Sequence, residues 1–239
     1  MTIGLCLVCT GRYDVFLPEL LEQVDRLFFP NDKVEVFLFT DKLKQYINSE
    51  RVSVNYIYTE HKPFPASTLY RFKYFSSQSE SLKSKCDYVF YMDVDMRIVE
   101  PIGHEILPEE GNDGLVGTLH CGFYHRGGSW EDNIDSKAYV PLENRKKYFA
   151  GGFQGGEVNA YMNAVKALAN NIDEDERNGV VPIWHDESAW NCYLSTRNPK
   201  ILTPDYCMVE NEQLRINWGV SNFIPKIIAL DKNHSEIRS

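Results

Sequence analysis

The stretch YVFYMDVD, residues 88–95, decides the fold class of this chain. Its first five residues are apolar or aromatic, as in a strand that is buried on both faces, and they run directly into Asp93 and Asp95. Strands of this kind belong to α/β sheets, which bind ligands beyond the carboxyl ends of their strands. The stretch therefore predicts a central sheet with a polar site at the end of this strand.

Upstream of this stretch, strand and helix patterns alternate. Residues 3–9, 34–40 and 52–58 have the pattern of strands. Apolar residues recur at intervals of three and four across residues 16–28, as on one face of a helix, with Asp14 as a candidate cap and Pro30 as its end. The order of strand, helix and strand predicts parallel pairing.

A further helix is expected from about Ser67 to Leu82, and the part of the chain after Asp95 continues the mixture. It predicts strands at 115–119 and 226–230 and helices at 157–171 and 184–194. Residues 122–141 are rich in Gly, Asp, Asn and aromatic residues without a sustained period, which indicates a loop that could carry a site. No repeat or linker divides the chain, so one mixed α/β domain over residues 1–239 is expected.

Composition and charge exclude several classes of protein. The formal net charge is −9 and no basic run occurs, so a nucleic-acid partner is not expected. The longest apolar stretches are far shorter than the roughly 20 residues of a membrane helix. A strand pattern begins at Ile3, where a signal peptide would need a basic segment before an apolar one. We therefore expect a cytoplasmic protein with no membrane span.

The six cysteines are expected to be reduced, because no export signal precedes them. Cys6 and Cys9 form a Cys-x-x-Cys, which is compatible with half of a zinc site or with a redox pair. Both lie within an apolar strand and no second pair follows at zinc-finger spacing, which favours buried, inert thiols.

Asp93 and Asp95 form the sharpest local signal. Two carboxylates that leave a buried strand are hard oxygen ligands for Mn²⁺ or Mg²⁺, which can bridge to a diphosphate, although two exposed loop acids would give the same tripeptide. The nucleophile motif of a phosphatase is rejected, because Arg97 stands where that motif has Thr.

Two further segments and the C-terminal tail have both structural and functional readings. Residues 149–156, FAGGFQGG, hold two glycine pairs ahead of a helix, typical of a turn, of a phosphate cradle or of a backbone that approaches a bulky ligand. Residues 184–188, WHDES, combine an indole with two acids, which suits a sugar site but also an ordinary helix start. Lys232 and Arg238 on the polar tail are either solvated or able to close over phosphates.

Taken together, the motifs closely resemble, in order and spacing, those of glycosyltransferase family 6, which includes the ABO blood-group transferases. The resemblance covers nearly the whole chain and rests on residues 93–96 (DVDM), 120–124 (HCGFY), 138–141 (AYVP), 148–153 (YFAGGF) with 155–156 (GG), 184–188 (WHDES), 202–206 (LTPDY) and 232–234 (KNH) with Arg238. It implies a GT-A type fold with a Rossmann-like mixed, mostly parallel central sheet flanked by helices. It also implies a nucleotide-binding half at about 1–100, an acceptor-binding half at about 101–230 and a flexible tail at 231–239.

The resemblance also implies roles for individual residues. The uracil and ribose of a UDP-sugar would be lined by Val8, Cys9, Thr10 and Tyr13. Arg71 and Asp186 would contact the donor sugar, whose 2-substituent would face Ala150, Gly151 and Gly152. Asp93 and Asp95 would hold ribose and metal, Glu187 would lie beneath the anomeric carbon, and Lys232 and Arg238 would grip the diphosphate. His120, Ser129, Trp184 and, more weakly, Glu210 would contact the acceptor.

The implied activity is that of a Mn²⁺- or Mg²⁺-dependent, retaining α1,3-glycosyltransferase. It would move GalNAc, in preference to Gal, from UDP-GalNAc or UDP-Gal to the 3-hydroxyl of a galactoside within an oligosaccharide acceptor similar to H antigen. A UDP-sugar hydrolase or nucleotidyltransferase, and a non-catalytic carbohydrate-binding protein, are the alternatives. Many bacterial relatives replace the acidic motif by Asn-x-Asn and work without metal, whereas this chain keeps both acids.

Overall fold

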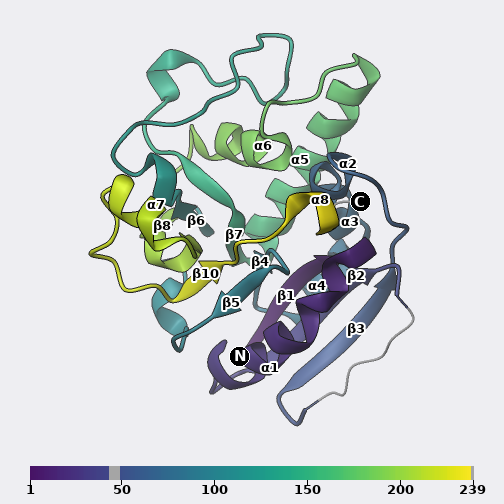
Figure 1. The fold of residues 1–239 in the computed structure, drawn as a ribbon. Helices are drawn as coiled ribbons and strands as arrows, with labels where there is room; N and C mark the ends of the chain where they lie inside the picture. The colour runs from purple at the N-terminus through teal and green to yellow at the C-terminus, as the bar shows by residue number, and fades with distance from the viewer. Residues whose placement is uncertain (43–48, 238–239) are drawn as a thin grey trace.

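A seven-stranded mixed sheet forms the centre of the computed structural model, which describes residues 1–42 and 49–237 (Figure 1). Within these residues the strand order is β3-β2-β1-β4-β7-β6-β8. The strands are β1 (Thr2–Cys9), β2 (Lys33–Thr40), β3 (Val52–Tyr58), β4 (Tyr88–Met92), β6 (Leu115–Leu119), β7 (Phe149–Glu157) and β8 (Lys200–Leu202). Parallel pairing joins β3, β2, β1 and β4 and also joins β6 to β8, whereas β7 is antiparallel to both of its neighbours. The expected mixed, mostly parallel α/β sheet is confirmed.

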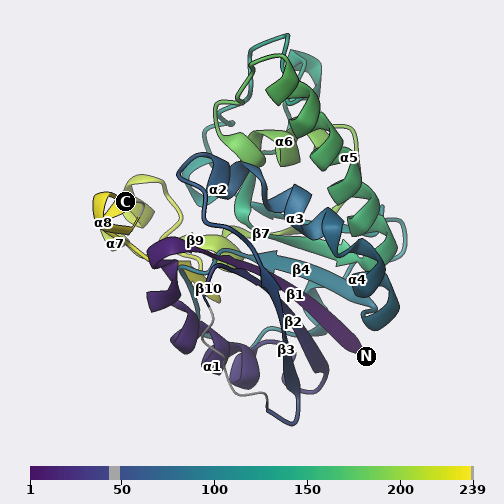
Figure 2. The same cartoon turned by 90° about the vertical axis from the view of Figure 1, so that its right-hand side faces the viewer.

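Helices cover both faces of this sheet (Figure 2). One face packs on α1 (Leu17–Leu27), whose Leu17, Leu20 and Val24 are buried. The other face carries α3 (Arg71–Ser77), α4 (Ser79–Lys85), α5 (Val158–Arg177) and α6 (His185–Leu194), which enclose a second apolar cluster. Within the described ranges, no helix combines the length and the apolar character needed to traverse a bilayer.

A small second sheet lies beyond the end of β4. Its strands β5 (Met96–Ile98), β10 (Ile227–Ala229) and β9 (Met208–Val209) follow the order β5-β10-β9. It brings the C-terminal segment back over the acids that follow β4, because the Leu230 N–H donates to the Asp95 carbonyl at 3.0 Å. The short helices α7 (Glu212–Asn217) and α8 (His234–Ile237) complete this part of the chain.

The glycine-rich segment at 149–156 is a strand rather than a turn ahead of a helix. β7 lies between β4 and β6 with all of its residues buried except Glu157. Glycine is required where neighbouring strands approach closely, since a Cβ on Gly155 would lie 2.4 Å from the Val89 carbonyl oxygen. At Gly156, φ is +153° and a Cβ would lie 2.2 Å from the Gly114 carbonyl oxygen. Tertiary packing therefore overrides the weak strand propensity of glycine.

Two expectations about helices are wrong in detail. The single helix expected at 67–82 is divided into α2 (Ala66–Leu69), α3 and α4, with breaks at Tyr70 and Gln78, where ψ is close to zero. Serines at 76, 77, 79 and 81 surround the second break and compete for backbone hydrogen bonds. Asp14 does not cap α1, because the N-cap position is Phe16 and it has no side-chain cap.

Candidate active site

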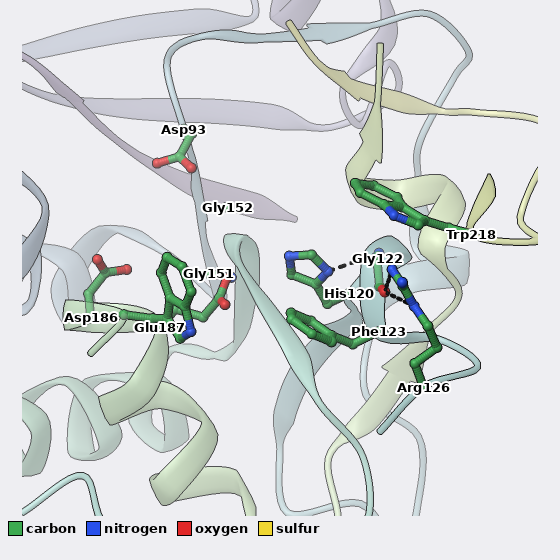
Figure 3. Close-up of a pocket in the computed structure, with 11 residues that line it drawn as sticks. Asp93, His120, Gly122, Phe123, Arg126, Gly151, Gly152, Asp186, Glu187 and Trp218 are labelled. Atoms are coloured by element: carbon green, nitrogen blue, oxygen red, sulfur yellow. Dashed lines mark hydrogen bonds between the residues drawn. The ribbon is translucent and has the colours of Figure 1, made fainter. Parts of the chain in front are cut away.

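A cavity of about 410 Å³ opens where β7, α6 and the loop after β6 meet (Figure 3). Its lining combines acids, glycines and aromatic rings, namely Asp93, His120, Gly122, Phe123, Arg126, Gly151, Gly152, Trp184, Asp186, Glu187 and Trp218. Acidic and indole side chains around one hollow suit a carbohydrate, which offers hydroxyl groups and an apolar ring face. The site lies beyond the carboxyl end of β4, as the sequence predicts.

A second, smaller cavity adjoins the first and shares Asp93 with it. It is lined by Val8, Thr10, Tyr13, Ser67, Tyr91, Asp93, Val94 and Asp95. Most of the residues expected to line a nucleotide pocket therefore come together here. Cys9 is the exception, because its side chain is fully buried in the core against α1. Alternation along β1 turns Cys9 away from the face that carries Val8.

Arg71 connects the acids of the two cavities from the first turn of α3. Its Nη2 lies 3.2 Å from Asp93 Oδ1 and its Nη1 lies 3.1 Å from Asp186 Oδ2. Nη1 also donates to the Gly151 carbonyl at 3.1 Å, and the guanidinium lies 4.2 Å from the centre of the Tyr91 ring. Only 4% of Arg71 is exposed, so its position is fixed before any ligand arrives. The break at Tyr70 places this arginine at the start of its own helix.

Asp186 is the buried partner of this arginine. Burial raises the pKa of Asp186 from 3.8 to about 7, against the opposing effect of Arg71 and with further increases from the charges of Asp93 and Glu187. The ion pair with Arg71 therefore responds to pH near neutrality.

Glu187, the next residue, presents its carboxylate to the larger cavity in a fixed orientation. Oε1 accepts a hydrogen bond from the Tyr148 hydroxyl at 2.8 Å, and Oε2 accepts one from the Gly151 N–H at 2.8 Å. Burial and the charge of Glu187 raise the pKa of Tyr148, so the phenol stays protonated and acts as the donor. Asn191 supports the same site, because its Nδ2 donates to the Glu187 carbonyl at 2.9 Å and to the Phe149 carbonyl at 2.7 Å.

His120 faces Glu187 across the cavity. The Gly122 N–H donates to His120 Nδ1 at 3.0 Å, which makes Nδ1 an acceptor. In the neutral imidazole the proton then lies on Nε2, the nitrogen that points toward the side of Glu187 (Figure 3). His120 can therefore offer an N–H to a ligand hydroxyl.

The glycines of β7 divide between the cavity and the sheet. Gly151 and Gly152 line the cavity, and an added Cβ would approach Asp186 Oδ2 at 3.1 Å or Asp93 Oδ2 at 2.9 Å, respectively. Ala150, expected beside them at the donor sugar, is instead buried in the core and does not line the cavity. Close approach of the backbone to a ligand is therefore available only at the first glycine pair.

The candidate acceptor residues are only partly brought together. Trp184 lines the cavity at 47% exposure, and its Nε1 donates to the Ser129 hydroxyl at 2.6 Å. Ser129 thus orients the indole. Glu210 lies outside the cavity lining, where Oε2 accepts from the Asp231 N–H at 2.8 Å and Oε1 lies 3.6 Å from Arg97 Nη1.

The polar tail reaches the small cavity through Lys232, whose ammonium forms an ion pair with Asp95 and lies 5.4 Å from the centre of the Tyr13 ring. Both partners are largely buried, with 14% of the Lys232 side chain and 10% of the Asp95 side chain exposed. Arg238, the other expected tail residue, lies outside the described residues.

Asp93 and Asp95 supply oxygen ligands but do not form a complete metal site on their own. Across residues 1–42 and 49–237, no three His, Cys, Asp or Glu side chains converge on one point. Mn²⁺ and Mg²⁺ are commonly held by one or two carboxylates together with substrate phosphates and water, so the two aspartates at one cavity wall fit such an ion.

The sequence analysis gives no role to two lining residues, Arg126 and Trp218, or to the buried Tyr148 that donates to Glu187. Tyr148 directly precedes the glycine-rich segment, which is the available signal for it. Arg126 lies within the stretch 122–141 identified as a loop, and Trp218 follows no recognisable pattern.

Comparison with known proteins assigns the chain to a family. The sequence profile of Glycosyltransferase family 6 matches residues 1–239. Histo-blood group ABO system transferase 1 of Rattus norvegicus is 32% identical over 247 residues, which cover 100% of this chain and 69% of the rat protein. The O-antigen biosynthesis glycosyltransferase WbnI of Escherichia coli is 26% identical over 235 residues, covering 97% of this chain and 95% of that protein. Globoside alpha-1,3-N-acetylgalactosaminyltransferase 1 of Homo sapiens is 25% identical over 248 residues, covering 100% and 69%.

The chain belongs to glycosyltransferase family 6. The resemblance read from the sequence is confirmed, and with it the assignment as a glycosyltransferase.

Proposed function

We propose that the protein is a retaining α1,3-glycosyltransferase that moves GalNAc, in preference to Gal, from a UDP-sugar to the 3-hydroxyl of a galactoside. An H-antigen-like galactoside, fucosylated at the 2-hydroxyl, is the proposed acceptor. Relatives whose names specify a histo-blood group ABO transferase and an alpha-1,3-N-acetylgalactosaminyltransferase support this choice of reaction.

The observation that carries the proposal is the pair of adjoining cavities that share Asp93. The small cavity, with Val8, Thr10 and Tyr13, suits the nucleoside, and the large cavity suits the transferred sugar and the acceptor. The bond to be broken would then lie between them, close to Arg71.

In the proposed mechanism the side chains of the site hold the donor and the acceptor in fixed positions. Arg71 holds Asp93 and Asp186 in one arrangement and leaves their remaining oxygens to the hydroxyls of donor ribose and sugar. The Glu187 carboxylate faces the anomeric carbon, where it either forms a covalent glycosyl intermediate or stabilises an oxocarbenium-like state. His120 Nε2–H donates to an acceptor hydroxyl and orients it for attack. Preorganised charges of this kind supply much of the rate enhancement in enzymes.

Asp93 and Asp95 would hold Mn²⁺ or Mg²⁺, which would supply positive charge to the departing diphosphate. Lys232 is already placed at the same wall through its ion pair with Asp95, and it would offer its ammonium to the phosphate oxygens.

The proposed preference for GalNAc rests on the bare wall at Gly151 and Gly152. Neither residue presents a side chain to an acetamido group, and a fitted small group is worth about 1–3 kcal/mol in discrimination. Gly152→Ala is a poor probe of this preference, because the new Cβ would also press on Asp93 Oδ2 and on Met96 Cε. The ratio of kcat/KM for UDP-GalNAc and UDP-Gal in the unaltered enzyme tests it directly, and a preference for UDP-Gal would refute the donor assignment.

Release of UDP distinguishes the proposed function from its alternatives. UDP-GalNAc or UDP-Gal is incubated with and without a fucosylated galactoside, and both UDP and the new glycan are measured. A transferase releases UDP in step with glycan formation, whereas a hydrolase releases it equally without acceptor. A carbohydrate-binding protein releases none, and either of these two outcomes would refute the proposal.

A further inference from the structure

The large cavity has a cationic end that the proposed reaction does not use. Asp93, Asp186 and Glu187 lie at one end, and Arg126 and Trp218 lie at the other (Figure 3). The guanidinium carbon of Arg126 lies 6.0 Å from the centre of the Trp218 ring. A guanidinium beside an indole on a cavity wall offers a ligand both a positive charge and an apolar ring face.

Arg126 is held in place by the same residue, Gly122, that orients His120. The Gly122 carbonyl accepts from Arg126 Nη2 at 2.8 Å and from Nε at 3.2 Å, while the Gly122 N–H donates to His120 Nδ1. The orientation of the guanidinium is therefore linked to that of the imidazole, although Arg126 is exposed.

Three of the five N–H groups of this guanidinium remain after those two bonds are made. Across residues 1–42 and 49–237, Arg126 forms no ion pair, whereas Arg71 and Arg145 each pair with a carboxylate. The free groups lie on the Nη1–Nη2 edge, the fork that binds both oxygens of a planar carboxylate.

We propose that Arg126 and Trp218 form a subsite for an acidic sugar of the acceptor, a residue with a ring carboxylate next to the galactoside that is glycosylated. This inference rests on the proposed function and specifies its acceptor further. The Nη1–Nη2 edge binds the carboxylate, and Trp218 contacts the ring of the same sugar. At the opposite end, Arg71 pairs with Asp93 and Asp186, and Glu187 accepts hydrogen bonds from the Tyr148 hydroxyl and the Gly151 N–H, which reduces the repulsion of a second carboxylate.

The test uses three acceptors that differ at one group: galactose fucosylated at its 2-hydroxyl and β-linked to glucuronic acid, to the methyl ester of that acid, or to glucose. With UDP-GalNAc as donor, kcat/KM for the acid is expected to exceed that for the ester about tenfold, the worth of a hydrogen-bonded charge at an exposed site. Arg126→Gln is expected to reduce this ratio to about one. Arg126→Lys keeps the charge but lacks the paired N–H donors of the guanidinium, and it is expected to retain part of the preference for the acid over the ester.

Arg26→Gln is the matched control, because Arg26 is exposed on α1 and its loss changes the net charge equally. It is expected to leave the acid-to-ester ratio unchanged, and 1 M salt is expected to lower that ratio in the unaltered enzyme. A ratio of one in the unaltered enzyme, or a ratio that survives Arg126→Gln, would overturn the subsite. Transfer to the acceptors that carry the ester or glucose would continue in both cases, whereas no transfer to any of the three fucosylated acceptors would refute the proposed function itself.

Discussion

Replacing Glu187 by Gln removes one charge from the proposed reaction centre while nearly preserving its shape. The structure determines how Gln fits. The Gly151 N–H can only donate, so the amide oxygen must take the place of Oε2, and the amide nitrogen then faces Tyr148. The Tyr148 hydroxyl can rotate and accept, so both hydrogen bonds remain as neutral ones.

The expected cost in stability is modest. Two charge-assisted hydrogen bonds of about 1.5–3 kcal/mol each become neutral bonds of about 0.5–1.5 kcal/mol each, which lowers the free energy of unfolding by about 2 kcal/mol. Removing a charge from a half-buried position offsets part of this loss. The variant is therefore expected to fold.

The expected effect on turnover is much larger. Loss of one preorganised charge at a reaction centre typically costs about 3–4 kcal/mol, so kcat should fall by about 10²–10³. The dissociation constant for UDP-GalNAc, measured by calorimetry, should change little, because the interaction develops in the transition state. Glu174→Gln, at an exposed pair with Lys137, serves as the control. A collapse of donor affinity with surviving turnover would show that Glu187 binds substrate and does not act in the chemical step.

Three further predictions concern the metal, the tail and pH. Chelation by EDTA is expected to abolish transfer and Asp95→Asn to lower turnover by about 10³, the cost of losing a strong charge contact; full activity in chelator with an unimpaired variant would contradict this. Deleting residues 232–239 removes the ammonium paired with Asp95 and is expected to lower kcat, so unchanged turnover would mean that the tail is only solvated. Because burial raises the pKa of Asp186 to about 7, the native state retains a proton that the unfolded chain loses near pH 4. The free energy of unfolding should therefore fall between pH 4 and 7, by up to about 1.4 kcal/mol per pH unit, and urea titrations of Asp186→Asn should show this dependence removed.

The parts of the fold that sequence could predict are those with local patterns. Apolar or alternating residues mark the strands β1, β2, β3 and β4, and apolar residues repeat along one face of α1. The sequence therefore predicts each of these elements close to its observed bounds. β7 was not expected to be a strand, because its glycines have no strand propensity and its place depends on β4 and β6 on either side.

The residues of the candidate site also divide into those with a local sequence pattern and those without one. Asp93, Asp186 and Glu187 were expected from motifs, and the structure brings them to one cavity. Arg126 and Trp218 come from separate loops with no local pattern, and only the tertiary fold brings them together.

The two glycine pairs of β7 differ in what a substitution would disturb, and this difference affects how the donor-sugar preference could change over evolution. At Gly155 and Gly156 the nearest atoms to an added side chain include main-chain carbonyl oxygens, which cannot move without displacing neighbouring strands. At Gly151 and Gly152 the nearest atoms belong to side chains, so an added methyl group would displace those side chains rather than a neighbouring strand. New donor preferences can therefore arise at the first pair when the neighbouring side chains change with it, while the second pair keeps the sheet intact. One strand thus combines a segment whose substitution would be absorbed by side chains with a segment whose substitution would displace backbone, only two residues apart.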